Sequence, residues 1–390
     1  MKYSFKFIAF AILLLNFSAA RAIINSNQFD IRHIGYAEGL SSQRVFSIVE
    51  DRYHAIWIST KEGVDRYNGQ NIKKYTLPGT LYYGDMAGRA IRLLHNIKSG
   101  LWTYDNTGRV YHYSEEKDKF NISFYLRKYI KNGCVLNKFY IDKDGSFWFC
   151  TNYGLFKKVL NKSIKCLIPN KNINDIIQIG TTFYIGTSYG IYKIIRKRPR
   201  LFIKGVNTQT LYYDYQDRDL WIGTFNNGLF IANAHTPKLR AIKGQNTSFY
   251  NPIRAITYYD KSVILIGIDG GGVYAVDKRQ NTIKKFMDAE DVTSTYLRGN
   301  GIYAVTKDSQ GNIWIGSYTG GISALLRCEY PIRIFVHQHG NYNSLRNDNV
   351  NKIIQNTNGD IWFANDLGIS IRKSSGTWCH ISNNSVVVPL

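Results

Sequence analysis

Cysteine and proline are scarce in this sequence, and what is missing narrows the classes of protein it can belong to. The 390 residues include 7 Pro and 5 Cys. The odd number of cysteines and the lack of any C-x-x-C spacing indicate neither a disulfide framework nor a zinc site. We identify no metal-binding or cofactor-binding motif. After the first 22 residues, no run is long and apolar enough to cross a membrane.

Acidic residues are also few. The chain has 28 Asp and Glu against 50 Lys and Arg, which gives a formal net charge of +22. A field of this sign attracts polyanions. An acidic polysaccharide or an anionic membrane surface fits an exported protein better than nucleic acid does. General solubility explains the charge equally well.

The first 22 residues have the organisation of a secretory signal peptide. Lys2 and Lys6 give a basic start, an apolar run follows at 7–17, and Ala20-Arg21-Ala22 fits an A-x-A cleavage site. The apolar run is too short for an uncleaved anchor. We therefore expect cleavage near Ala22 and a mature chain outside the cytoplasm.

Tyrosine and glycine, in contrast, are abundant, and a short sequence motif of Trp, Ile, Gly and Thr, here called the phrase, recurs along the chain. Aromatic residues make up 14% of the sequence, with 29 Tyr, and there are 33 Gly. The phrase reads "AIWISTKEGV" at 55–64, "LWIGTFNNGLF" at 220–230 and "GNIWIGSYTGGI" at 311–322. Its aromatic position recurs every 36–49 residues and is occupied by Trp57, Trp102, Trp148, Tyr184, Trp221, Leu265, Trp314 and Trp362. Such a period over a chain too long for one compact core indicates an array of similar units.

Each unit has the pattern of four short strands. An apolar run leads into an Asp/Asn-Gly turn such as "DKDGS" at 142–146, and the strand that carries the aromatic residue follows. A second turn ends on Gly, and two more strands close the unit. Four antiparallel strands in this length form one blade of a β-propeller, and the large aromatic side chain fills the wedge between neighbouring blades.

The predicted fold is therefore all-β, a β-propeller of four-stranded antiparallel blades. Two blade counts are open. Seven blades at 23–340 can form the ring, with 341–390 as an eighth unit that begins a second propeller. Alternatively, "FDIRHIGY" at 29–36 supplies the outer strand of the last blade and the ring closes on eight. We favour seven.

The stretch at 39–77, "GLSSQRVFSIVEDRYHAIWISTKEGVDRYNGQNIKKYTL", resembles the two-component regulator propeller repeat, and "HQHGNYNSLRNDNVNKII" at 337–354 is similar to a linker between its blades. The resemblance covers about residues 30–373. It implies the periplasmic sensor portion of a Bacteroidetes-type hybrid two-component histidine kinase, with an oligosaccharide as its signal and with dimerisation. The kinase, receiver and membrane helix of that family have no counterpart in this sequence.

A ligand of a propeller is expected over the mouth of the ring, where the loops between second and third strands meet the connections between blades. Aromatic and amide side chains there suit a sugar. The candidates, which turn geometry alone also explains, are Tyr104, Asp105, Asn106, Asn152, Tyr153, Tyr189, Phe225, Asn226, Asn227, Asp269, Tyr318 and Asp366.

We expect no catalytic residues. A glycosidase needs two carboxylates placed across a pocket. The acids Asp51, Asp142 and Asp308 recur at equivalent positions of the units, which indicates a structural role. A secreted propeller glycosidase or lyase is the alternative from another class, and a scaffold that binds only protein partners is a third.

Overall fold

A computed structural model of the chain describes residue 24 and residues 29–79, 89–130, 133–160, 162–196, 198–289, 296–327 and 335–382. The predicted signal peptide lies outside this part. The described residues fold into β-strands and two short 3-10 helices, η3 (Leu126–Lys128) and η4 (Thr247–Tyr250). The chain divides into two compact units, Met1–Arg327 and Cys328–Leu390. The boundary predicted between residues 340 and 341 therefore falls inside the second unit.

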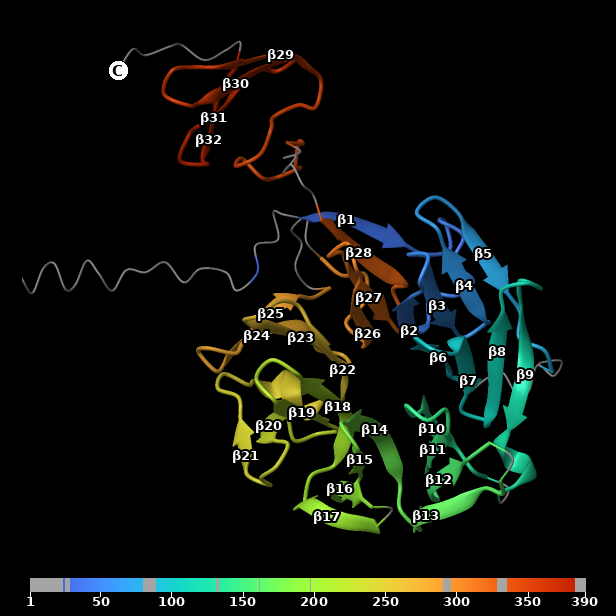
Figure 1. Ribbon diagram of the computed structural model, residues 1–390. Helices are drawn as coiled ribbons and strands as arrows, with labels where there is room; N and C mark the ends of the chain where they lie inside the picture. Colours follow the sequence, from blue (N-terminus) through green and yellow to red (C-terminus); the bar gives the residue numbers. More distant parts are fainter. Residues whose placement is uncertain are drawn as a thin grey trace, which may run out of the picture. The chain divides into compact units, whose positions relative to one another are not determined.

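The first unit contains six antiparallel sheets whose four strands follow one another in the chain (Figure 1). Sheets 1 to 3 are β2 (Val45–Glu50), β3 (Ile56–Thr60), β4 (Val64–Tyr67) and β5 (Ile72–Tyr75); β6 (Ile91–Asn96), β7 (Gly100–Asp105), β8 (Arg109–Ser114) and β9 (Lys119–Tyr125); and β10 (Leu136–Ile141), β11 (Phe147–Thr151), β12 (Gly154–Lys158) and β13 (Lys165–Pro169). Sheets 4 to 6 are β14 (Ile173–Ile179), β15 (Thr182–Thr187), β16 (Gly190–Ile195) and β17 (Arg198–Lys204); β18 (Thr208–Asp214), β19 (Asp219–Thr224), β20 (Leu229–Asn233) and β21 (Leu239–Ala241); and β22 (Ile253–Tyr258), β23 (Val263–Ile268), β24 (Gly272–Asp277) and β25 (Thr282–Met287).

The seventh sheet joins the two ends of this unit. It consists of β26 (Ile302–Lys307), β27 (Ile313–Ser317), β28 (Ile322–Arg327) and, as its outermost strand, β1 (Phe29–Ile34). Strand β1 pairs with β28 in an unbroken antiparallel register from Phe29↔Arg327 to Ile34↔Ile322. The first strands of the seven sheets contact one another in a closed circle, with β26 next to β2. The predicted β-propeller is confirmed. Its ring has seven blades, and the eight-bladed alternative is wrong because the N-terminal strand completes the seventh blade.

Hydrophobic residues fill the spaces between the blades. Each of the seven described core clusters combines residues of two successive blades, and the last of them joins the seventh blade to the first. Trp57 of the first blade is fully buried against Tyr113 and Phe120 of the second, with ring centroids 4.8 and 5.9 Å apart. The recurring aromatic residue is thus the wedge that the repeat pattern predicts.

The recurring aspartates Asp51, Asp142 and Asp308 stabilise the turns that precede Trp57, Trp148 and Trp314. In three blades the indole N–H donates to a carboxylate six residues earlier, at 2.6 Å for Trp57 to Asp51 and 2.8 Å for Trp148 to Asp142. The same carboxylates accept backbone N–H groups of the turn. Their repetition therefore has a structural cause.

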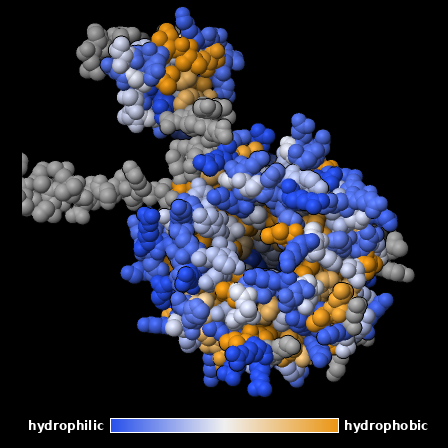
Figure 2. Space-filling view, in the orientation of Figure 1, coloured by the Kyte–Doolittle hydropathy of each residue, from blue (hydrophilic) through white to orange (hydrophobic). Residues whose placement is uncertain are grey.

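The second unit contains a single four-stranded sheet among its described residues: β29 (Val350–Gln355), β30 (Ile361–Asn365), β31 (Gly368–Arg372) and β32 (Trp378–Ile381). Phe335, Phe363 and Trp378 form its aromatic core, with centroids 5.4–5.6 Å apart. Its wedge residue Trp362 is only half-buried, and Ile353 on β29 is 60% exposed. Hydrophobic side chains gather on the surface of this unit (Figure 2).

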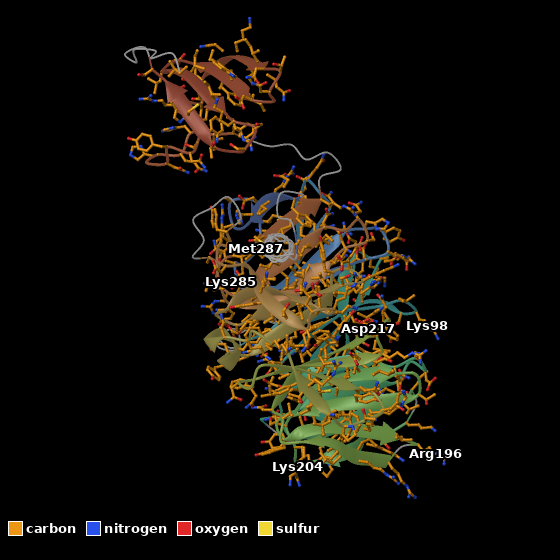
Figure 3. The ribbon with its side chains drawn as sticks, turned by 90° about the vertical axis from the view of Figure 1, so that its left-hand side faces the viewer. Lys98, Arg196, Lys204, Asp217, Lys285 and Met287 are labelled. Atoms are coloured by element: carbon orange, nitrogen blue, oxygen red, sulfur yellow. The ribbon has the colours of Figure 1, made fainter. Side chains whose placement is uncertain are left out.

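The strand order gives the ring two different faces. The second-to-third turns and the connections between blades lie on one face, which we call the mouth face, and the remaining turns lie on the opposite face. Figure 3 shows the ring edge-on. The turns of the opposite face lie on one side and include Lys98, Arg196 and Asp217. The mouth face lies on the other side, where β25 ends at Met287.

Candidate functional site

The innermost strands bring one equivalent side chain from each blade to the centre of the ring. In each of these strands, the first residue is fully buried and the second, half-buried or nearly buried, lines a central cavity. In ring order, these second residues are Phe46, Arg92, Asn137, Asn174, Gln209, Arg254 and Tyr303. Because the inner strands start at the mouth face, this set lies at the mouth end of the channel.

A local irregularity accompanies this position. In six of the seven inner strands the register with the neighbouring strand shifts at the second residue, for example between Val45 and Ser47. A β-bulge leaves one residue outside the regular pairing and redirects its side chain. In the second blade the pairing is regular, with Arg92 opposite Tyr104. This blade contributes Tyr104 of its second strand to the cavity as well.

The cavity has a volume of about 350 Å3, which is within the range of small-molecule sites. Its lining is mostly polar. Besides the seven second residues and Tyr104, it includes the third residues of four inner strands, Ser47, Lys138, Asp175 and Thr210. Burial raises the pKa of Tyr104, so this phenol stays neutral.

Two of the three cations of the cavity are paired with carboxylates. Lys138 forms an ion pair with Asp175. Burial alone would lower the pKa of Lys138, but this pairing raises it overall. Arg254 donates from Nε and Nη2 to Oδ2 of Asp269, at 3.2 and 3.0 Å.

The third cation, Arg92, has a different environment. Its Nη1 donates to the backbone oxygen of Asn137 at 2.8 Å. Among the described residues, no carboxylate forms a salt bridge with it. The described cavity therefore carries an excess of positive charge, and that excess is located at Arg92.

Aromatic rings form one corner of the cavity. Tyr303 stacks on Tyr318 with centroids 5.2 Å apart, and Phe46 meets both rings edge-on at 6.0 and 6.1 Å. The guanidinium of Arg254 lies 4.9 Å from the centroid of Tyr303. Burial raises the pKa of Tyr303, Arg254 opposes this shift, and a hydrogen bond with Asp269 adds to it.

Three of the residues predicted from the sequence are part of this arrangement. Tyr104 lines the cavity, Asp269 holds Arg254, and Tyr318 supports Tyr303. These three come from the second, sixth and seventh blades, so the structure brings them to the same end of the channel.

The other predicted residues do not line the cavity. Asp105 is fully buried and pairs with Arg89 at 2.8 Å, and the amide oxygens of Asn106 and Asn152 accept backbone N–H groups of neighbouring segments. Asp366 lies in the second unit, where it accepts hydrogen bonds from two Asn side chains. The remaining five are exposed: Tyr153, Tyr189, Phe225, Asn226 and Asn227.

Sequence reasoning missed most of the cavity, including both arginines. The signal that could have found them is the residue after the first buried position of each inner strand. In the aligned units this column reads Phe, Arg, Asn, Asn, Gln, Arg and Tyr, followed by Asn in the eighth unit. It varies, whereas the position before it is Val, Ile, Leu or Thr in every unit. A variable position directly after a constant buried one is therefore the sequence feature that indicates this site.

The described residues show no group of three His, Cys, Asp or Glu side chains that could hold a metal ion. The part of the chain that the structure describes also has no helix with the length and hydrophobicity to span a membrane.

Comparison with known proteins identifies the repeats. The family model of the two component regulator propeller matches residues 39–62 and 296–319. No curated protein matches the sequence significantly.

Solved structures show the same fold. The chain is similar to the extracellular domain of a protein described as a hybrid two component system from B. thetaiotaomicron (20% identity, TM-score 0.67, 91% of this chain and 49% of that one). It is also similar to the extracellular domain of another protein from that organism, described as a one component system (17%, TM-score 0.60, 91% and 54%). Virginiamycin B lyase from Staphylococcus aureus is a third similar structure (12%, TM-score 0.60, 76% and 99%). The chain spans about half the length of the two B. thetaiotaomicron domains.

The two matched stretches lie in the first and seventh blades, which β1 joins into one ring. The chain therefore carries two-component regulator propeller repeats, set in a seven-bladed β-propeller and one further blade-like sheet.

Proposed function

We propose that this chain is the ligand-sensing propeller of a two-component signal transduction system, and that it recognises an oligosaccharide in the central cavity of its ring. We place it in the periplasm, where it would regulate the use of a glycan. The family of its repeats and the extracellular domains that it resembles support the sensing role.

The composition of the seven second residues is the observation that supports an oligosaccharide as the ligand. Three amides lie on one side, two aromatic rings on the other, and an arginine at each junction. Amides bind the hydroxyl groups of sugars in donor and acceptor pairs, and aromatic faces cover their apolar C–H surfaces.

The alternative of a glycosidase has less support. The cavity has one carboxylate among its described lining residues, Asp175. Its Oδ2 accepts the backbone N–H of Leu211 at 2.7 Å, and its Oδ1 accepts that of Ile176 at 2.7 Å. A carboxylate engaged by its own scaffold, without a second one across the cavity, does not meet the need of glycoside hydrolysis for two.

A thermal-shift screen against a panel of neutral and acidic oligosaccharides tests the proposal. A ligand at 100 times its Kd stabilises the folded state by about 2.7 kcal/mol. Gln209→Ala should abolish the shift without loss of stability, because the Gln209 side chain has no described hydrogen-bond partner. Tyr189→Ala, a change on the exposed rim of the mouth, is the matched control.

Two results would contradict the proposal. A shift that survives Gln209→Ala and disappears in Tyr189→Ala would move binding from the cavity to the rim. New reducing ends after incubation with the panel would indicate hydrolysis in place of sensing.

A further inference from the structure

The order of side chains around the cavity divides its wall into distinct parts. Phe46 and Tyr303 are neighbours because the first blade follows the seventh in the closed ring. Arg92 borders this aromatic corner on one side and Arg254 on the other. The amide residues of the third, fourth and fifth blades form the opposite arc, Asn137, Asn174 and Gln209.

The amide arc is oriented to accept hydrogen bonds. Nδ2 of Asn137 donates to the backbone oxygen of Ile173 at 2.8 Å, and Nδ2 of Asn174 donates to that of Thr208 at 2.7 Å. These bonds fix both amides, and their Oδ1 atoms have no described donor. Hydroxyl groups of a bound molecule can supply the missing donors.

The two arginines are not equivalent, although they are placed symmetrically. Arg254 is neutralised and held in place by Asp269, so its main effect is to position Tyr303. Arg92 uses one N–H group on a backbone oxygen and has no described carboxylate partner. A guanidinium has five N–H donors in a planar fork that fits a carboxylate or sulfate.

We infer that Arg92 binds the anionic group of an acidic sugar whose ring lies against Phe46 and Tyr303 and whose hydroxyl groups face the amide arc. The inference rests on the proposed function and adds to it the class of ligand and the residue that selects it. Arg254 positions the aromatic corner and does not bind the anionic group of the ligand.

The test compares two forms of the same ligands. Short uronic-acid oligosaccharides from pectin, alginate and chondroitin are titrated against the full chain by calorimetry, each beside its methyl ester, which has the same sugar without the charge. We expect the wild-type protein to prefer the acid form by roughly ten- to hundredfold, since a hydrogen bond to a charged group contributes that much.

Arg92→Gln should weaken binding of the acid form much more than binding of the ester, and so reduce this preference to near unity. The double variant Arg254→Gln/Asp269→Asn removes the other arginine without changing the net charge, and it should keep the preference. Arg92→Lys should retain part of it. The melting temperature of each variant shows whether it is folded.

Each outcome separates this inference from the proposed function. Equal binding of acid and ester forms, weakened together by Gln209→Ala, would overturn the role of Arg92 and leave the saccharide sensor standing. A preference that persists in Arg92→Gln, or that is lost in the double variant, would place the anion elsewhere. If no acidic or neutral saccharide binds, both fail.

Discussion

Asp308 supports both a turn and a buried indole, and replacing it by Asn separates the two roles. Its Oδ1 accepts the backbone N–H groups of Gln310 and Asn312, at 3.0 and 2.8 Å. Its Oδ2 accepts Nε1 of Trp314 and Nδ2 of Asn312, both at 2.8 Å. Asp308→Asn keeps the shape and the first oxygen, but it puts an NH2 group where the indole needs an acceptor.

The expected cost follows from burial. Trp314 is 3% exposed, so its N–H group cannot turn to water. A buried donor without a partner costs about 1–3 kcal/mol, and the loss of the contact with the half-buried Asn312 adds about 0.5 kcal/mol. We expect the free energy of unfolding to fall by about 2–3 kcal/mol and Tm by about 3–6 °C.

The same substitution elsewhere in the ring provides the control. Asp277 also accepts two backbone N–H groups of a turn with its Oδ1, at 2.8 and 2.9 Å, and no indole donates to it. Asp277→Asn should therefore change stability by less than about 0.5 kcal/mol. Urea unfolding followed by Trp fluorescence measures both variants. Equal effects of the two substitutions would refute the role of the indole hydrogen bond.

The second unit already contains the equivalent of this variant. Asn356 stands six residues before Trp362, and its Oδ1 accepts the backbone N–H groups of Asn358 and Asp360 as Asp308 does in the ring. The buried Nε1 of Trp362 has no hydrogen-bond partner. The natural Asn thus preserves the turn and leaves the indole unsatisfied, as expected for Asp308→Asn.

Three further predictions concern the ring. Ile34→Ala should lower the free energy of unfolding by about 2–4 kcal/mol, measured by urea unfolding, because buried Ile34 joins the N-terminal strand to Ile322. Burial alone would raise the pKa of Asp142, but hydrogen bonds from an indole and Lys157 lower it overall. The stability it adds is present above the ordinary Asp pKa and is lost as pH falls below it, so the Tm difference between wild type and Asp142→Asn should shrink from pH 7 to pH 3. Gly190→Ala should prevent stable folding in thermal melts, because the added Cβ would lie 2.1 Å from a backbone oxygen of β17.

The architecture could be predicted from the sequence because it depends on features that every blade needs. A wedge between blades requires a large side chain, and the turn before it requires a hydrogen-bond acceptor. Residues equivalent to Trp57 and Asp51 therefore recur in other units. Even Leu265, which replaces Trp in the sixth unit, is fully buried between two blades. The role of the N-terminal strand was also readable, since residues 29–36 resemble an outer strand. The number of blades, however, depends on the pairing of β1 with β28. These strands lie at opposite ends of the ring's sequence, so no local sequence pattern predicts that they pair.

The residues of the cavity were harder to predict from the sequence, because the candidates were chosen among polar residues in turns. Turn residues often use their side chains on the backbone, and Asp105 shows this. Its Oδ1 accepts the N–H groups of Thr107 and Arg109, and its Oδ2 binds Arg89. Such a carboxylate is already satisfied and has little left for a ligand. Tyr104, the preceding residue of β7, lines the cavity.

The inner strands separate stability from recognition at adjacent positions. The first residue of each is a fully buried member of an interface between blades, as Ile253 and Ile302 are. In six of the seven blades a bulge takes the second residue out of the pairing and directs it to the cavity, so its type has little effect on the sheet. These positions can change independently while the wedges remain. The difference between Arg92 and Arg254 then depends on one carboxylate, Asp269, at the start of a turn, and a change at that single position would convert a positioning arginine into a second site for an anion.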